Sequence, residues 1–122
     1  MINPEKIFVE SEKIKWEAVA GGVQRKILGY DEKIMMVKVD CKKGGIGALH
    51  KHPHSQVTFL AKGVFEVQIG EEKKILKEGD CFYIPPDVIH GAVTLEDGLL
   101  IDVFSPMRED FLNKDVQSFY NK

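Results

Sequence analysis

The sequence has few of the residues that mark a disulfide-stabilised protein. Only two cysteines occur among its 122 residues, Cys41 and Cys81, and they form no Cys-x-x-Cys pair. Both lie in apolar, strand-like surroundings, which predicts two reduced, buried thiols. A disulfide scaffold is therefore not indicated.

Long apolar runs and basic clusters are also missing. No segment approaches the roughly 20 apolar residues that a membrane span needs, and the N-terminus has no basic start followed by an apolar run. The 17 basic and 19 acidic residues leave a formal net charge of -2, without a basic run interleaved with aromatic side chains. These absences predict a cytoplasmic protein with neither a nucleic-acid nor a membrane partner.

What the chain does have is enough apolar material for one core. Its 43% hydrophobic residues are enough to form the core of a single domain over residues 1–122 without stabilising cross-links. We expect an N-terminal arm over residues 1–23, a barrel over residues 24–104, and a C-terminal helix and tail over residues 105–122. The arm carries more apolar side chains than the edge of one small barrel needs, which predicts a homodimer with the arm at its interface.

Alternating patterns predict short strands along almost the whole chain, separated by turns at Lys62-Gly63 and Glu96-Asp97-Gly98 among others. The expected strands are Lys6–Val9, Ile14–Val19, Gln24–Leu28, Lys33–Cys41, Val57–Ala61, Val64–Ile69, Lys73–Leu76, Cys81–Ile84, Ile89–Val93 and Leu99–Phe104. One short helix is expected from Pro106 to Asn113, with Ser105 as its N-cap. The fold class is all-β, a barrel or a sandwich.

The most informative stretch is His50-Lys51-His52-Pro53-His54-Ser55-Gln56. Residues two apart point the same way along an extended strand, so His50 and His52 present their rings to one face. Imidazole nitrogen is the commonest ligand for several transition metals, and the amide oxygen of Gln56 can complete part of the coordination sphere. Pro53 interrupts the strand and leaves His54 in a turn, outside the site. For this pair alone, two surface imidazoles remain an equal alternative.

The spacing of these residues resembles the two motifs of the cupin superfamily of double-stranded β-helix, or jelly-roll, proteins. The first motif corresponds to Gly44, His50, His52, Gln56 and Gly63, and the second to Gly79, Pro85, Asp87, His90 and Thr94. The resemblance implies a single-domain all-β barrel that holds one divalent transition metal through His50, His52, Gln56 and His90. Nitrogen-rich sites accept Zn, Ni, Mn, Fe and Cu, so the identity of the metal stays open.

One departure from the family pattern bears on chemistry. Gln56 stands where the motif has a glutamate, so every ligand is neutral and a divalent metal keeps its full positive charge. Such a site favours an anionic ligand. It also lacks the two-histidine, one-carboxylate face of the non-haem iron oxygenases, which argues against a dioxygenase.

A second informative stretch lies near the C-terminus. Asp102 and Phe104 share strand parity, and Arg108 follows in the first turn of the expected helix, where its guanidinium can reach a carboxylate. Taken singly, each of these residues has a simpler interpretation that we prefer: Asp102 faces solvent, Phe104 lies in the core and Arg108 lies on the surface. Combined with the histidine stretch, they resemble a cupin subgroup that opens the ring of 4,5-unsaturated monouronates. This resemblance implies a small anionic sugar as substrate and Asp102, Phe104 and Arg108 as catalytic residues.

Alternative functions remain at this stage. A metal-dependent cupin dioxygenase would use the same ligands and consume oxygen, and a non-catalytic sugar-binding cupin would bind its ligand without forming a product. A purely structural barrel ranks last, because four potential ligands would then converge without a metal. The sequence does not separate pectin-derived from alginate-derived substrates.

Overall fold

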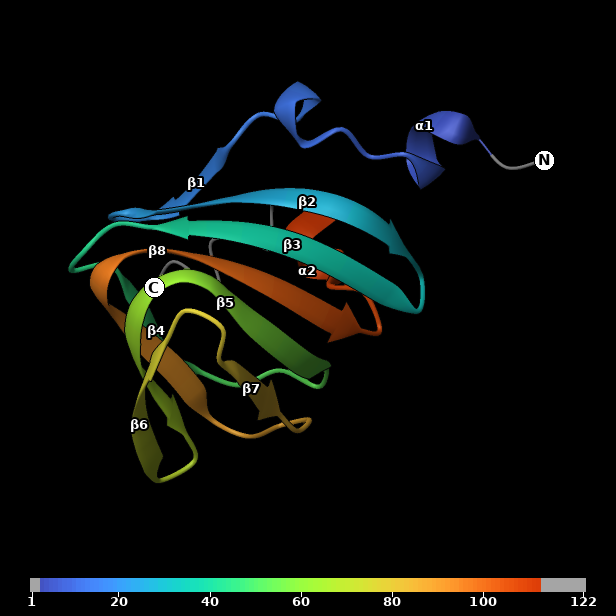
Figure 1. The fold of residues 1–122 in the computed structure, drawn as a ribbon. Helices are drawn as coiled ribbons and strands as arrows, with labels where there is room; N and C mark the ends of the chain where they lie inside the picture. The colour runs from blue at the N-terminus through green and yellow to red at the C-terminus, as the bar shows by residue number, and fades with distance from the viewer. Residues whose placement is uncertain (1–2, 113–122) are drawn as a thin grey trace.

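Antiparallel strands make up most of the computed structural model, which describes residues 3–112 (Figure 1). Along the chain the elements are α1 (Pro4–Ile7), a short 3-10 helix (Ser11–Lys13), β1 (Glu17–Ala20), β2 (Val23–Asp31), β3 (Ile34–Cys41), β4 (Ile46–His50), β5 (Ser55–Ile69), β6 (Glu72–Lys77), β7 (Cys81–Ile84), β8 (His90–Ser105) and α2 (Glu109–Leu112). The all-β fold predicted from the sequence is confirmed. No helix within residues 3–112 is long and apolar enough to cross a membrane.

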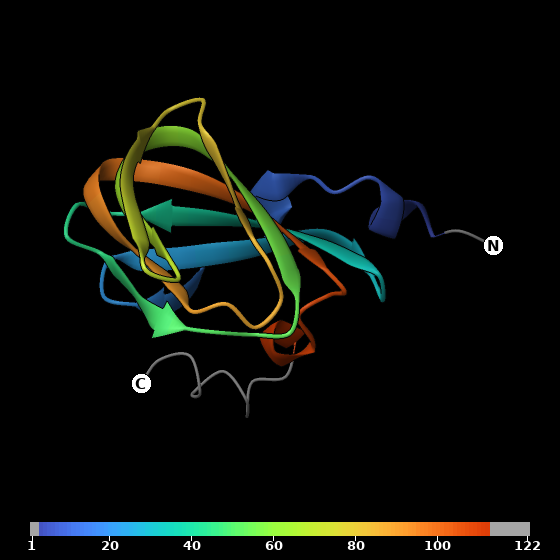
Figure 2. The same ribbon diagram turned by 90° about the horizontal axis from the view of Figure 1, so that it is seen from below.

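Two long strands, β5 and β8, belong to both layers of the fold. The first part of β5 pairs with the last part of β8, where β3, β2 and β1 continue the layer on one side and β7 on the other. The last part of β5 pairs with the first part of β8, beside β4 and β6. Both strands curve from one layer into the other (Figures 1 and 2). This arrangement wraps the inward-facing side chains around one interior.

The sequence prediction of turns inside β5 and β8 is wrong, because both strands continue through these positions. The pairing of β5 with β8 shifts register between Leu60 and Phe65, so the strands bend instead of ending. Gly63 has a φ of 92°, and a Cβ there would lie 2.5 Å from the Cα of Gly98. Glycine is required at this contact because a side chain would collide with the backbone of β8.

The N-terminal arm differs from the expected pair of strands. Residues 4–7 form a helical turn in which the Phe8 amide donates to the Pro4 carbonyl at 3.0 Å, and strand pairing starts only at Glu17. Proline suits a first helical turn, where its missing N–H is not needed. The arm runs along the outer side of β2, where Lys26 Nζ donates to the Ser11 carbonyl at 2.9 Å (Figure 1).

The C-terminal helix begins later than expected. Ser105 still pairs with Ser55 as the last residue of β8, so it is not an N-cap, and helical structure starts at Glu109. Strand pairing overrides the local capping signal at this point. The expected helix end at Asn113 lies outside the described residues.

The interior holds two apolar clusters at different heights. One consists of Cys41, Leu60, Phe65, Val67 and Leu100, and the other of Met35, Val37, Phe104 and Phe111. Cys41 is buried as expected, but Cys81 is exposed, which contradicts the prediction of two buried thiols. Phe82 and Ile84 take the inward positions of β7, so Cys81 faces outward by strand alternation.

Candidate metal centre and its pocket

Three imidazoles converge where β4 ends and β8 begins. His50 and His90 occupy opposite positions in the β4–β8 pairing, and His52 follows in the loop before β5. The ring centroid of His90 lies 4.4 Å from that of His50 and 4.7 Å from that of His52. One nitrogen from each ring can be chosen so that all three lie within 4.8 Å of one another, an arrangement that could hold a metal ion.

Backbone carbonyls orient all three rings. The Nδ1 atoms of His50, His52 and His90 lie 2.8 Å, 3.1 Å and 2.9 Å from the carbonyls of residues 48, 54 and 88. An Nδ1–H that donates to a carbonyl leaves the Nε2 lone pair available to a metal. Burial lowers the pKa of His52 and of His90 to about 4, so both rings are neutral and able to ligate at neutral pH.

Gln56 supplies a test of whether a metal fits this site. Its Nε2 donates to Thr58 Oγ1 at 2.9 Å, which directs its Oε1 to 3.0 Å from Nε2 of His52. Neutral His52 carries one ring proton, although both of its nitrogens face oxygen acceptors; with that proton on Nδ1, Nε2 and Oε1 are two acceptors in close contact. A cation between them resolves the conflict, and the fourth predicted ligand therefore fits a metal beside the three imidazoles.

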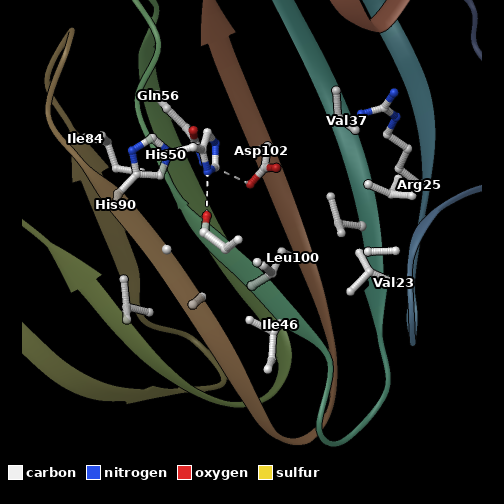
Figure 3. A pocket seen from close by; sticks show the side chains of 18 of the residues that line it. Val23, Arg25, Val37, Ile46, His50, Gln56, Ile84, His90, Leu100 and Asp102 are labelled. Atoms are coloured by element: carbon white, nitrogen blue, oxygen red, sulfur yellow. Dashed lines mark hydrogen bonds between the residues drawn. The ribbon is translucent and has the colours of Figure 1, made fainter. Parts of the chain in front are cut away.

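A hydrogen-bonded chain joins Gln56 to Asp102. The Thr58 hydroxyl donates to Asp102 Oδ1 at 2.6 Å. Gln56 Nε2 approaches the same oxygen at 3.5 Å (Figure 3). Burial raises the pKa of Asp102 to about 6, against the opposing effects of the Thr58 hydrogen bond and the Arg108 charge. Thr58 is fully buried and was missed by sequence reasoning. The one sequence feature that pointed to Thr58 was its position two residues after Gln56, which places both side chains on the same face of the strand.

Phe104 lies on β8 opposite Gln56 in the β5–β8 pairing, and Arg108 approaches its ring. The Phe104 ring centroid is 5.8 Å from that of His52. Arg108 is 2% exposed, which contradicts the reading as a surface arginine, and it lies just before α2 and not in its first turn. Its Nε and Nη2 donate to the carboxylate of Asp110 at 3.1 Å and 3.0 Å, and its guanidinium carbon lies 5.0 Å from the centre of the Phe104 ring.

One cavity of about 500 Å³ is lined by His50, Gln56, His90, Asp102, Phe104 and Arg108. In Figure 3 the imidazoles of His50 and His90, with Asp102, lie at one end of the cavity, and Ile46 lies toward the other end. A further cation, Arg25, lines the same cavity and is 6% exposed. Sequence reasoning missed this residue, because among the charges of β2 only its parity with Val23 and Ile27 distinguishes it.

Comparisons with known proteins agree with this fold. The family model described as a cupin domain matches residues 37–104. The chain therefore belongs to the cupin family. The matched segment runs from the middle of β3 to the end of β8 and includes all four predicted ligands.

Relatives with high identity point to one branch of this family. The chain is 47% identical over 107 residues to the pectin degradation protein KdgF of Dickeya dadantii, covering 86% of this chain and 96% of that protein. Among solved structures, an RmlC-like cupin from Shewanella frigidimarina is 44% identical with a TM-score of 0.83, covering 85% of this chain and 94% of that one. KdgF from a Halomonas species is 40% identical with a TM-score of 0.82, covering 85% and 96%.

Proposed function

We propose that this chain is an enzyme that opens the ring of 4,5-unsaturated monouronates, released by the breakdown of pectin or alginate, to give linear keto acids. The observation that carries the proposal is the continuous link from His52 through Gln56 and Thr58 to Asp102, which sets an acid–base group beside a metal-binding cluster. The relationship to the pectin degradation protein KdgF supports the substrate class.

The reaction needs two proton transfers. In the unsaturated uronate the ring oxygen is attached to an alkene carbon. Removal of the proton from the anomeric hydroxyl by Asp102 breaks the bond between the anomeric carbon and the ring oxygen, and the products are an aldehyde and an enolate. The enolate then becomes a ketone by taking that proton back from Asp102 at C4. Asp102 serves both transfers, because a pKa of about 6 lets it hold or release a proton near neutral pH.

The remaining site residues bind and orient the substrate. A divalent metal held by His50, His52, Gln56 and His90 would supply Lewis-acid stabilisation of negative charge on substrate oxygens. Arg108 adds a buried positive charge that favours an anionic sugar, and its pairing with Asp110 fixes its orientation.

Incubation with the unsaturated monouronates from pectin and from alginate tests the proposal. Loss of the ultraviolet absorbance of the conjugated alkene is followed against spontaneous opening, and NMR identifies the product. We expect acceleration by the metal-loaded protein that a chelator removes. A metal-loaded protein without acceleration would contradict the proposal. Oxygen uptake would then favour a dioxygenase, and ligand binding without a product would favour a sugar-binding cupin.

We also propose that the enzyme works in the cytoplasm as a homodimer. Phe8 on the arm is 74% exposed, and Val57, Phe59 and Tyr83 on the outer face of β5 and β7 are 44%, 47% and 55% exposed. Apolar surface of this kind is typical of a protein interface. Sedimentation at micromolar concentration tests the dimer, and a purely monomeric protein would contradict it. Cell fractionation tests the location.

A further inference from the structure

Two buried arginines face each other across one aromatic ring beside the cavity. The guanidinium carbon of Arg25 lies 3.8 Å from the centre of the Phe111 ring, and that of Arg108 lies 4.3 Å from it. Both side chains line the cavity that contains Asp102. Burial of two cations is costly unless carboxylates pair with them, and Glu17 and Asp110 supply one carboxylate to each.

The two guanidinium groups differ in what already binds them. Arg108 uses Nε and Nη2 for the carboxylate of Asp110, so one edge of its planar fork is occupied. Arg25 donates from Nε to Glu17 Oε1 at 2.8 Å. Among residues 3–112 its two terminal nitrogens make no hydrogen bond. Those nitrogens are a pair of parallel donors of the kind that binds a carboxylate bidentately.

The position of Arg25 suits a substrate that also reaches Asp102. Arg25 pairs with Val39, and Val37 pairs with Asp102, so the two functional residues lie on strands separated by β3. Two strand spacings combined with the two-residue offset from Val39 to Val37 amount to roughly 12 Å between the two backbones, of which the long Arg25 side chain spans a part, so one sugar ring and its carboxylate can bridge the rest. Figure 3 shows the Arg25 guanidinium across Val37 from Asp102, and the charge of Arg25 favours the ionised form of that carboxyl group.

We propose that Arg25 is the residue that binds the substrate carboxylate, through its two terminal nitrogens, and that Glu17 orients it by holding Nε. This inference rests on the proposed function for the identity of the substrate. Arg108, which Asp110 holds, then adds positive charge to the pocket and packs against Phe104 and Phe111, without the direct contact to a substrate carboxylate expected from the sequence.

The test compares the 4,5-unsaturated galacturonate with its uncharged methyl ester in the metal-loaded enzyme. We expect Arg25→Met to lower kcat/KM for the uronate by about 10- to 100-fold, mostly through KM, and to leave the ester within about twofold, because one charge-assisted pair is lost. Arg25→Lys should recover only part of the loss, since it keeps the charge without the fork. Lys26→Met removes one charge from the outward side of the same strand and should match the wild type.

Equal losses on uronate and ester, or no loss on the uronate, would overturn the assignment of Arg25. Metal content and melting temperature confirm that each variant is folded. If Arg25→Met does not fold, Arg25→Lys decides by the same comparison. Calorimetry that compares the binding of saturated galacturonate with that of galactose separates this proposal from the ring-opening function. If the wild type binds galacturonate but opens no substrate, only the ring-opening function is contradicted. Equal affinity of wild type and a folded Arg25 variant for galacturonate, or no binding by either, contradicts the carboxylate site.

Discussion

The two ends of the barrel interior are built from the same strands but with opposite chemistry. On β5, Leu60 packs into an apolar cluster, while Gln56 and Thr58, which share its inward parity, form a polar chain. On β8, Leu100 joins the same cluster and Asp102, two residues further, accepts the hydrogen bond from Thr58. Alternation therefore selects which residues face inward. On β5 and β8, Leu60 and Leu100 pack into the apolar cluster, and the inward residues next to them, Thr58 and Asp102, take part in the polar chain.

The two ends also differ in what burial does. Burial of apolar groups in the Leu60 cluster is the main source of stability. At the other end burial lowers the pKa of His52 to about 4 and raises that of Asp102 to about 6, so it disfavours every charged form. The polar end is therefore expected to carry function at a cost in stability, and the apolar end to supply that stability.

The largest effect is expected from removing a metal ligand. His90→Ala should lower metal affinity by more than about 100-fold, because loss of a ligand costs more than loss of its hydrogen-bond partner, and should reduce ring opening to the spontaneous rate. The Leu60 cluster is untouched, so far-ultraviolet circular dichroism should stay unchanged. Metal analysis after dialysis measures the loss. Full metal occupancy in this variant would remove His90 from the ligand set.

Asp102→Asn is expected to lower kcat by about 10²- to 10⁴-fold, the usual contribution of a general acid–base group. Metal content should stay at the wild-type value, because Asp102 is not among the four predicted ligands. Single-turnover kinetics and metal analysis on one preparation measure both quantities. Retained activity would exclude Asp102 as the proton-transfer group.

Leu60→Ala examines the apolar end. Leu60 is 0% exposed, and its truncation should lower the free energy of unfolding by about 2–5 kcal/mol. The molecules that remain folded should keep their metal and their kcat, because the polar chain is not altered. Urea unfolding combined with activity per folded molecule measures the separation. A parallel fall in kcat would show that the two ends are coupled.

Acid should weaken the metal-free protein through its histidines. The pKa of His52 and of His90 is about 4 in the folded state against 6.5 unfolded, so between these values the unfolded state binds more protons and stability falls as pH falls. Asp102 acts in the opposite direction, because its pKa of about 6 exceeds 3.8 and the folded state binds the extra proton. The free energy of unfolding, measured with urea between pH 7 and pH 4.5, should therefore fall more steeply with falling pH for Asp102→Asn than for the wild type. Parallel pH dependences of the two proteins would contradict these pKa shifts.

The smallest expected effect concerns the two cysteines. Burial raises the pKa of Cys41 to about 12, whereas Cys81 is exposed on β7. A thiol reagent at pH 8 should modify Cys81 within minutes and leave Cys41 unmodified until the protein unfolds. Ring opening should not change, because Cys81 faces away from the cavity. Mass spectrometry identifies the modified position, and rapid labelling of Cys41 would show that the apolar end opens.

Local spacing was sufficient to predict His50, His52 and Gln56 as ligands but not to predict the residues that contact them. His50, His52 and Gln56 stand within seven residues and lie on consecutive segments, so sequence distance translated directly into proximity. Thr58 and Arg25 gained their positions only through pairing with strands far away in the chain. A buried arginine and a surface arginine have the same local sequence signal, and burial depends on what α2 and β1 place over it.

Strand existence was also easier to predict than strand continuity. Alternation located the segments of β5 and β8 correctly, but glycines at the bends looked like turns. Whether a glycine ends a strand or bends it depends on a partner that continues the hydrogen-bond ladder, and here Gly63 of β5 meets Gly98 of β8. The predicted start of the C-terminal helix was wrong for the same reason, because the pairing of Ser105 with Ser55 keeps residue 105 in the sheet.

The sequence by itself determined the all-β class, the alternation of most strands and the proximity of His50, His52 and Gln56, three of the predicted ligands. These properties follow from the period of a strand and from the chemistry of individual residues, which are local. Only the tertiary structure decided that β5 and β8 cross both layers, that Thr58 joins Gln56 to Asp102, and that Arg25 faces the same cavity as Arg108. Those relations depend on which distant strands pair and in what register, and the free energy of pairing is a property of the whole barrel.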